Sequence, residues 1–210
     1  MAIFQPSAFF AGNWRPEGLP GTNHGIEIQQ TLPDDPIGTN PCFVSLFDPA
    51  SNTAFYSAYK VTPQQAAGLG TFGRDDINKN WRQPPGVAGV NQAYYEAINT
   101  DRAPLSKGHM NPLGINTFDK RFMRATFTLT NAVPQYQTSN NEDWQEFETR
   151  ISNYAKTCGS NTRRGTLYLL TGKSGYGLTT DEELSWRCNT CHPSCRVDSG
   201  LLCVARIKTN

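Results

Sequence analysis

The sequence predicts an α+β fold, in which a mainly antiparallel central sheet is flanked by helices. Two apolar runs within residues 43–61 flank a turn at residues 48–52, which is the pattern of a β-hairpin. Apolar residues recur at helical spacing between residues 141 and 155, and an apolar strand segment follows at residues 166–171. Because strands and helices do not alternate regularly, the order favours an antiparallel sheet over a parallel one.

The start of the chain and two later segments complete this prediction. Residues 1–40 are dense in Pro, Gly and Asn, which predicts a loop-rich start. A short helix-like segment is expected near residues 92–98. Residues 125–131 alternate, with Phe127 and Leu129 on one side and threonines on the other, and this pattern predicts a half-buried strand.

The 141–155 segment has the pattern of an amphipathic helix. Trp144, Phe147 and Ile151 recur on one side of it. Two acidic residues near its start favour the positive end of the helix dipole. Glu148 lies four residues after Trp144 and shares its inward side, where carboxylates are uncommon unless they are partnered or functional.

Length and charge set the outer limits of the prediction. A chain of 210 residues fits one domain, and no apolar run approaches the roughly 20 residues that span a bilayer. The net charge of +1 does not by itself indicate a polyanionic partner. Five basic residues stand against two acids between residues 101 and 124: Arg102, Lys107, Lys120, Arg121 and Arg124. This cluster is either a footprint for phosphate binding or a solvated charged surface.

The cysteines indicate an oxidising compartment. The chain contains Cys42, Cys158, Cys188, Cys191, Cys195 and Cys203. Their even number and the crowding of four near the C-terminus predict disulfides, so we expect a secreted protein. The alternative is a zinc site within residues 188–203, whose ligand spacing is irregular. The N-terminus lacks the basic and apolar regions of a signal peptide, as a mature chain with an added Met would.

The triplet Lys107-Gly108-His109 is the first candidate for chemistry. A lone histidine is usually not catalytic, but Gly108 permits close backbone approach and Lys107 places a cation nearby. A neutral imidazole, with an ordinary pKa of about 6.5, can take a proton from water near neutrality. We expect the ammonium of Lys107 to hold the pKa of His109 down and keep this base free.

A second group of polar residues follows about twenty residues later. Asn131 and Gln135 are neutral amides that could orient water or a ligand, and Asn140 precedes the expected helix. The expected strand and helix would bring Asn140 back towards His109. The structural alternatives are that Asn140 caps the helix and that Asn131 is a turn residue at a strand end.

Together these residues resemble the DNA/RNA non-specific endonucleases of the ββα-metal (His-Me finger) superfamily. That family's signature is Asp-Arg-Gly-His, then Ser/Thr-Asn-x-x-Pro-Gln, then Asn-x-x-x-Trp-x-x-x-Glu. Here the last two motifs are present as Thr130-Asn131-Ala-Val-Pro134-Gln135 and Asn140-x-x-x-Trp144-x-x-x-Glu148. Within the family the chain looks most like endonuclease-domain-containing-1-like proteins, which also follow the His with an Asn-Pro pair, here Asn111-Pro112.

The resemblance implies an active site built on a ββα-metal finger. His109 would be the general base that activates water. Asn140 would be the one direct protein ligand of a divalent metal, Mg²⁺, with Mn²⁺ or Ca²⁺ as substitutes, and an ion that keeps most of its waters suits a single amide ligand. Glu148 would hydrogen-bond the metal's waters, with support from Asn131 and Gln135.

The remaining assignments concern cations and organisation. Lys107 stands where the family has Arg. A lysine gives a point charge but cannot donate two parallel hydrogen bonds to a phosphate, as an arginine can. Lys79 falls where relatives place an upstream Arg before Asn-Trp. The resemblance covers about residues 10–178 of a single domain at 1–210, and residues 179–210 form a Cys-rich elaboration. The expected substrates are DNA and RNA, with no membrane partner and no signal for an oligomeric state. The alternative is a catalytically weakened nuclease fold that binds nucleic acid or another protein.

Overall fold

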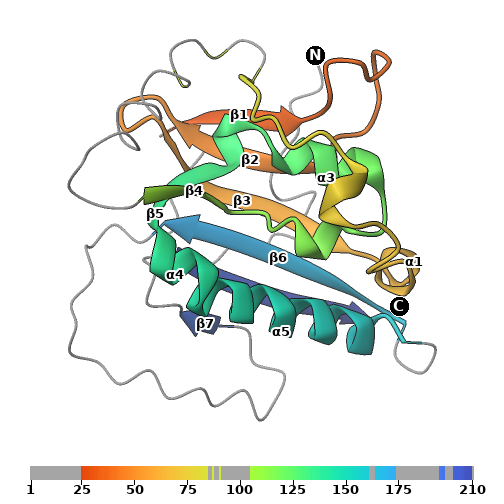
Figure 1. Cartoon of the computed structure of the whole chain (residues 1–210). Coiled ribbons are helices and arrows are strands. Elements are labelled where there is room, and N and C mark those ends of the chain that lie inside the picture. The colour runs from red at the N-terminus through yellow and green to blue at the C-terminus, as the bar shows by residue number, and fades with distance from the viewer. Residues whose placement is uncertain are drawn as a thin grey trace.

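The central sheet of the protein is antiparallel, with strand order β1-β2-β3-β6-β8-β7 (Figure 1). The computed structural model describes residues 25–84, 87, 90, 105–160, 164–173, 194–196 and 201–209. Within this part, the strands are β1 (Ile26–Gln30), β2 (Phe43–Asp48), β3 (Thr53–Val61), β6 (Gly165–Lys173), β7 (Ser194–Arg196) and β8 (Leu201–Thr209). The predicted α+β fold with a mainly antiparallel sheet is confirmed.

The predicted hairpin is formed by β2 and β3. Their turn is stabilised by the Asp48 carboxylate, which accepts a hydrogen bond from the amide of Ala50, and by Asn52, which adopts a positive φ of 52° that Asn tolerates better than most residues. The apolar residues of both strands are buried on both faces. The predicted strand at residues 166–171 is also confirmed, as the central part of β6, which pairs with β3.

The predicted strand at residues 125–131 is wrong. Helix α3 (Lys120–Thr126) covers its start, and a 3-10 turn, η5 (Leu129–Asn131), covers its end. The alternating pattern did not indicate a strand because the residues on both of its sides are buried. The threonine hydroxyls form hydrogen bonds with the nearby backbone. The hydroxyls of Thr126 and Thr128 donate to carbonyls three residues earlier, which favours turns over a strand.

A second, two-stranded sheet carries the predicted finger. It consists of β4 (Leu105–His109) and β5 (Ala132–Tyr136), and it leads into α4 (Gln137–Asn141) and α5 (Asp143–Cys158). In Figure 1 this strand–strand–helix unit lies against one face of the central sheet. Helix α4 contacts both β4 and β5, so the arrangement matches the predicted ββα unit.

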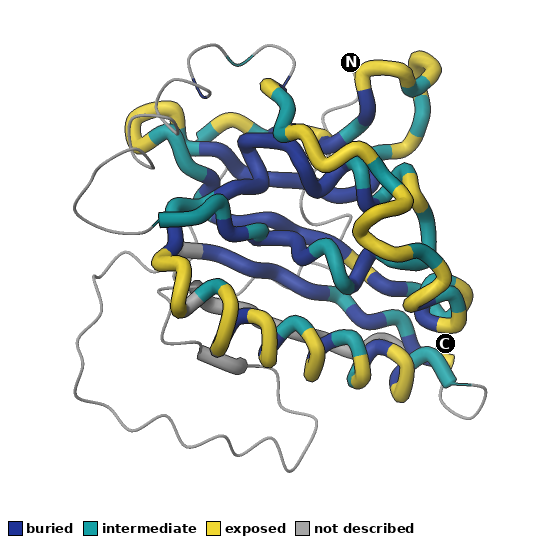
Figure 2. Tube along the Cα trace, viewed as in Figure 1, coloured by how far each residue is buried: buried dark blue, intermediate teal, exposed yellow. Residues whose placement is uncertain are grey.

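Helix α5 packs through one apolar side, as its pattern predicts. Trp144, Phe147, Ile151 and Ala155 are buried in one core cluster with Leu167 of β6 and other residues of the central sheet. Figure 2 shows the consequence: β2, β3 and β6 are buried along most of their length, whereas the outer side of α5 is exposed. None of the helices in the described part of the chain is long and apolar enough to cross a bilayer.

The ends of the chain depart from the predicted organisation in two places. The loop-rich start contains a strand, β1, within its described part, because residues 26–30 pair with β2. Strand β8 lies within the segment expected to be an elaboration, yet it pairs with β6 from Gly165–Thr209 to Lys173–Leu201. Residues 201–209 therefore build the central sheet. The helix expected near residues 92–98 lies outside the described residues.

Candidate active site

His109 ends strand β4 and sits in an aromatic setting. Its ring centroid lies 4.6 Å from that of Trp81 and 4.8 Å from that of Phe127, which it meets edge-on. The Nε2 atom is buried and has no hydrogen-bond partner among the described residues. Because a buried polar atom without a partner is costly, the most direct function of this nitrogen is to meet a group that is not part of the protein.

The environment keeps this imidazole neutral. The pKa of His109 is lowered to about 3, first because burial disfavours the charged ring and second because the Arg74 guanidinium repels it. The expectation that Lys107 supplies the repelling charge is therefore wrong: the cation that acts on His109 belongs to Arg74. The predicted outcome, a free base at neutral pH, is the same.

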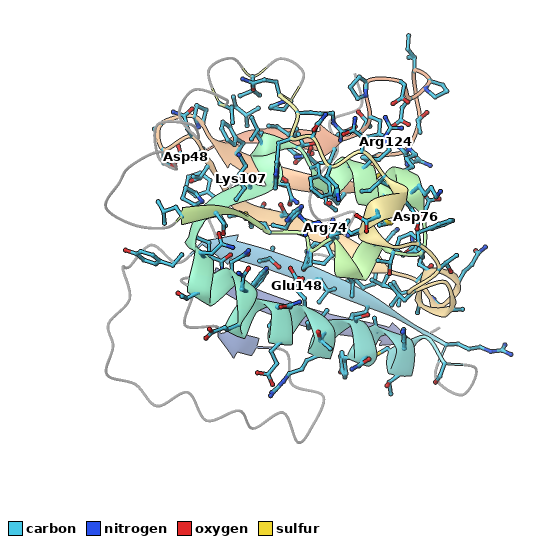
Figure 3. All side chains as sticks on the ribbon, viewed as in Figure 1. Asp48, Arg74, Asp76, Lys107, Arg124 and Glu148 are labelled. Atoms are coloured by element: carbon cyan, nitrogen blue, oxygen red, sulfur yellow. The ribbon has the colours of Figure 1, made fainter. Side chains whose placement is uncertain are left out.

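Arg74 is a site residue that the sequence analysis missed. It opens the 3-10 turn η3 (Arg74–Asp76), and its guanidinium carbon lies 5.9 Å from the Phe127 ring centroid. In Figure 3 its side chain and that of Glu148 face the same space between η3 and α5. No sequence spacing relative to His109 marks Arg74. The available signal was a cation directly after Gly73, at the start of a turn.

Lys79, the upstream cation expected at the site, lies at the surface. Its ammonium is 2.8 Å from the Asp75 carboxylate in an exposed ion pair one helical turn apart in sequence. Lys107 lies in β4, opposite Pro134 of β5, and on the same side of the strand as His109 because alternate residues of a strand share a side.

Glu148 is the half-buried carboxyl of α5. Its pKa is raised to about 7, mainly by burial, and the opposing effects of Trp144 and Arg74 are smaller. The Trp144 indole N–H is buried and makes no hydrogen bond of standard geometry within the described part, but it faces the carboxyl closely enough to favour its charged form. Glu148 forms no ion pair with another described residue, so its negative charge is available to a cation from outside the protein.

Gln135 lies directly against Gly108. A Cβ atom at position 108 would clash with the Gln135 Oε1 atom and lie 3.2 Å from the Gln135 Cβ atom. A side chain at this position would therefore have to displace the Gln135 amide. The Gln135 side chain is buried, and neither of its amide atoms has a partner in the described part of the chain. Its amide atoms are therefore free of protein hydrogen bonds in the described part of the chain.

Asn131 makes its side-chain hydrogen bonds within the protein. Its Oδ1 atom accepts from the amide of Asn111 at 2.8 Å and from the Ser57 hydroxyl at 3.0 Å. Its Nδ2 atom donates to the carbonyl oxygens of Asn111 and Thr126. All four hydrogen-bonding positions of the amide are thus occupied by the protein, which leaves none for a metal's water.

Asn140 lies within α4 and is half-buried. It does not cap α5, because the N-cap position of that helix is Glu142. Its side chain makes no hydrogen bond to the described residues, so its amide oxygen can serve as a ligand. An amide oxygen at Asn140 and a carboxyl at Glu148 are oxygen donors of the kind that a hard divalent cation prefers.

The basic residues around α3 do not form a free phosphate-binding patch. Arg121 donates to both oxygens of Asp35, at 2.8 and 2.7 Å, and Arg124 pairs with Asp34. The Lys120 ammonium lies 5.1 Å from the centroid of the Phe72 ring. The structure thus favours the structural interpretation for these three residues, whereas Arg102 lies outside the described residues.

The cysteines were expected to form disulfides. Cys42 carries a free thiol whose pKa is raised to about 12, mainly by burial, because its side chain lies among core residues. Cys158 is also buried. Cys195 and Cys203 are direct partners across β7 and β8. Cys188 and Cys191, and with them the zinc alternative, lie outside the described residues.

Comparisons with known proteins agree with this arrangement. A sequence model of the DNA/RNA non-specific endonuclease family matches residues 24–182. The fold is similar to that of a chain in the crystal structure of the EndoG/EndoGI complex, with a TM-score of 0.53 and 17% sequence identity over 80% of this chain. The match spans 65% of that chain. A search of curated proteins found no match. The family match covers most of the chain and includes the motifs at residues 107–109, 130–135 and 140–148, and the chain therefore belongs to the DNA/RNA non-specific endonuclease family.

Proposed function

We propose that the protein is a metal-dependent endonuclease that hydrolyses phosphodiester bonds in both DNA and RNA. The observation that carries this proposal is the half-buried, neutral imidazole of His109, whose buried Nε2 atom has no partner in the described part of the chain. Membership of a nuclease family supports it. Sugar-independent cleavage is consistent with a site whose groups would act on the phosphodiester and do not need a 2′-hydroxyl.

His109 would act as the general base. Its Nε2 atom would take a proton from the attacking water as the new phosphorus–oxygen bond forms and the bond to the leaving 3′ oxygen breaks. The phosphodiester brings negative charge next to the ring, which raises the pKa of His109 from its low value towards that of an effective base. The contacts with Trp81 and Phe127 would restrict rotation of the His109 ring and so hold the Nε2 atom in one orientation.

Asn140 and Glu148 would hold the metal. The amide oxygen of Asn140 would bind the ion directly, and the Glu148 carboxylate would accept hydrogen bonds from its waters. A bound Mg²⁺, or Mn²⁺ or Ca²⁺ in its place, supplies charge neutralisation at the phosphate and the leaving oxygen. Its positive charge would also lower the pKa of Glu148 from about 7 and keep the carboxylate ionised.

Arg74 would be the principal protein cation at the reacting phosphate, in the role that we first assigned to Lys79. Its guanidinium acts on both His109 and Glu148, whereas Lys79 pairs with Asp75 at the surface. A planar guanidinium can donate to two phosphate oxygens at once, which a lysine cannot do. Lys107 would add a second, point-like charge on the His109 side of β4.

Cleavage of plasmid DNA and of RNA tests the proposal. We expect the protein to cut both substrates with Mg²⁺ and to lose activity in EDTA. Asn140→Ala should shift the Mg²⁺ concentration needed for half-maximal rate upwards, whereas Asn141→Ala, one residue along the same helix, should not. If the wild type cuts neither substrate with Mg²⁺, Mn²⁺ or Ca²⁺, the chain is a catalytically weakened nuclease fold that binds nucleic acid or another protein.

We also propose that the protein is secreted and that disulfides form in its Cys-rich segment. The register that places Cys195 directly opposite Cys203 makes this pair the first candidate. Mass spectrometry after alkylation without reductant tests this. Modification of all six cysteines in the unfolded protein would contradict the proposal.

A further inference from the structure

Two serines interrupt the apolar strands at the centre of the sheet. Ser45 of β2 and Ser57 of β3 are fully buried and lie directly opposite each other. Their hydroxyl oxygens are 2.8 Å apart. Burying a hydroxyl costs free energy unless it is hydrogen-bonded, so we looked for the further hydrogen-bond partners of these two serines.

The two serines belong to a hydrogen-bond chain that has Gln30 at one end and Asn131 at the other. Ser57 donates its only proton to the Asn131 Oδ1 atom at 3.0 Å, so the bond between the serines must run from Ser45 to Ser57. Ser45 in turn accepts from the Gln30 Nε2 atom at 3.1 Å. The same Nε2 atom donates to the hydroxyl of Thr130, next to Asn131, at 2.7 Å. The chain therefore runs from Gln30 of β1, through β2 and β3, to Asn131.

Asn131 connects this hydrogen-bond chain to the two residues that follow strand β4. Its carbonyl oxygen accepts from the amide of Met110 at 2.9 Å, and its side chain bonds both the amide and the carbonyl of Asn111. These are the two residues that follow His109. The backbone amide of Asn111 can only donate, so it fixes which end of the Asn131 amide carries the oxygen, and the Ser57 hydroxyl therefore donates to that oxygen.

We propose that Gln30, Ser45 and Ser57 are positioning residues for His109, which they hold through Asn131. The inference rests on the proposed function, because it concerns the placement of the general base. The chain connects the rigid central sheet to the exit of β4 and contacts no substrate. Its loss should lower the rate of the chemical step and leave substrate and metal binding unchanged, because misplacement by a fraction of an ångström affects the transition state first.

Ser57→Ala is the test, with Thr171→Val as the matched control. Thr171 of β6 lies directly beside Ser57 in the sheet, is equally buried, and shares a hydrogen bond with the Tyr59 hydroxyl instead of Asn131. For Ser57→Ala we expect kcat to fall by about tenfold, with KM and the Mg²⁺ dependence unchanged. Thr171→Val also loses a buried hydroxyl, but it should keep the wild-type kcat.

A double variant adds a test of the chain itself. If Ser45 acts through Ser57, Ser45→Ala should reduce kcat alone but cause no further loss in the Ser57→Ala background. Wild-type kcat in Ser57→Ala, or an equal loss in Thr171→Val, would overturn the proposal. So would an additive effect of the two serine variants.

Amide hydrogen exchange separates this proposal from the proposed function. The amides of Met110 and Asn111 donate to Asn131, so they should exchange faster in Ser57→Ala than in the wild type or in Thr171→Val, whether or not the protein cuts nucleic acid. If the wild type is inactive, the proposed function fails, and this comparison still decides the positioning. Equal exchange of both amides in all three proteins would overturn it.

Discussion

The Gln135 amide oxygen occupies the space that a side chain at Gly108 would need. The glycine before His109 therefore leaves room for a packing contact across the two-stranded sheet. The amide atoms of Gln135 lack hydrogen-bond partners in the described part of the chain.

Gly108→Ala should disrupt the site through this contact. The added methyl displaces Gln135 or separates β4 from β5, which we expect to cost about 1–3 kcal/mol of stability and most of the activity. Thermal unfolding and cleavage assays measure both. Gly108→Ala combined with Gln135→Ala should regain part of the lost stability, because the clashing amide is gone. A double variant no more stable than Gly108→Ala would show that the amide is not the obstacle.

Arg74→Ala should reduce cleavage far more than Lys79→Ala. Arg74 acts on both His109 and Glu148, whereas the Lys79–Asp75 pair is exposed and screened by solvent. We expect kcat/KM to fall by about 100-fold or more for Arg74→Ala and less than about twofold for Lys79→Ala, in line with the loss of one charge-stabilising group at a reacting centre. Arg74→Lys should recover only part of the rate. Equal losses in the two alanine variants would contradict this assignment.

Glu148→Gln should stabilise the metal-free protein at alkaline pH. The pKa of Glu148 is raised from 4.5 to about 7, so its contribution to stability is fully present below pH 4.5 and is lost as the pH rises through 7. The neutral amide removes this loss, by up to about 3 kcal/mol at pH 8. Urea unfolding at pH 5 and pH 8, in EDTA, measures the difference. A variant that is destabilised more at pH 8 than at pH 5 would show that the carboxylate is stabilised in the folded protein.

For His109 we expect the opposite dependence of folding stability on pH. Its pKa is lowered from 6.5 to about 3, so its contribution to stability is present above pH 6.5 and is lost as the pH falls towards 3. The NMR signals of the His109 ring should therefore stay those of the neutral form down to about pH 4 in the metal-free protein. Titration of the ring near its ordinary pKa of about 6.5 would contradict the burial and repulsion described here.

The sequence sufficed to predict the elements whose apolar periodicity is simple. The β2–β3 hairpin, β6 and α5 each bury residues in the pattern that they show along the chain. The 125–131 segment failed because its threonines are buried and bonded to the local backbone, and alternation does not distinguish this from a half-buried strand. Partners distant in sequence, such as β8 beside β6, leave no local signal.

Some residues of the candidate site could likewise be predicted from the sequence, and others could not. Gly108, His109, Asn140 and Glu148 were found through motifs of fixed spacing, and the structure places them on strand β4 and on helices α4 and α5 of the predicted unit. Arg74 was missed because it comes from a turn with no fixed distance to His109. The fully bonded amide of Asn131 could be recognised only when Ser57, 74 residues earlier, was seen beside it.

The rate of DNA cleavage by His109→Ala, with and without added imidazole, tests the central claim most directly. Removal of a general base is expected to slow cleavage by about 100-fold to 10,000-fold, and imidazole in solution should restore part of the rate because it can take the same proton. Trp81→Phe, which keeps an aromatic ring against His109, serves as the control and should remain responsive to Mg²⁺ without imidazole. Cleavage by His109→Ala at the wild-type rate would contradict the account.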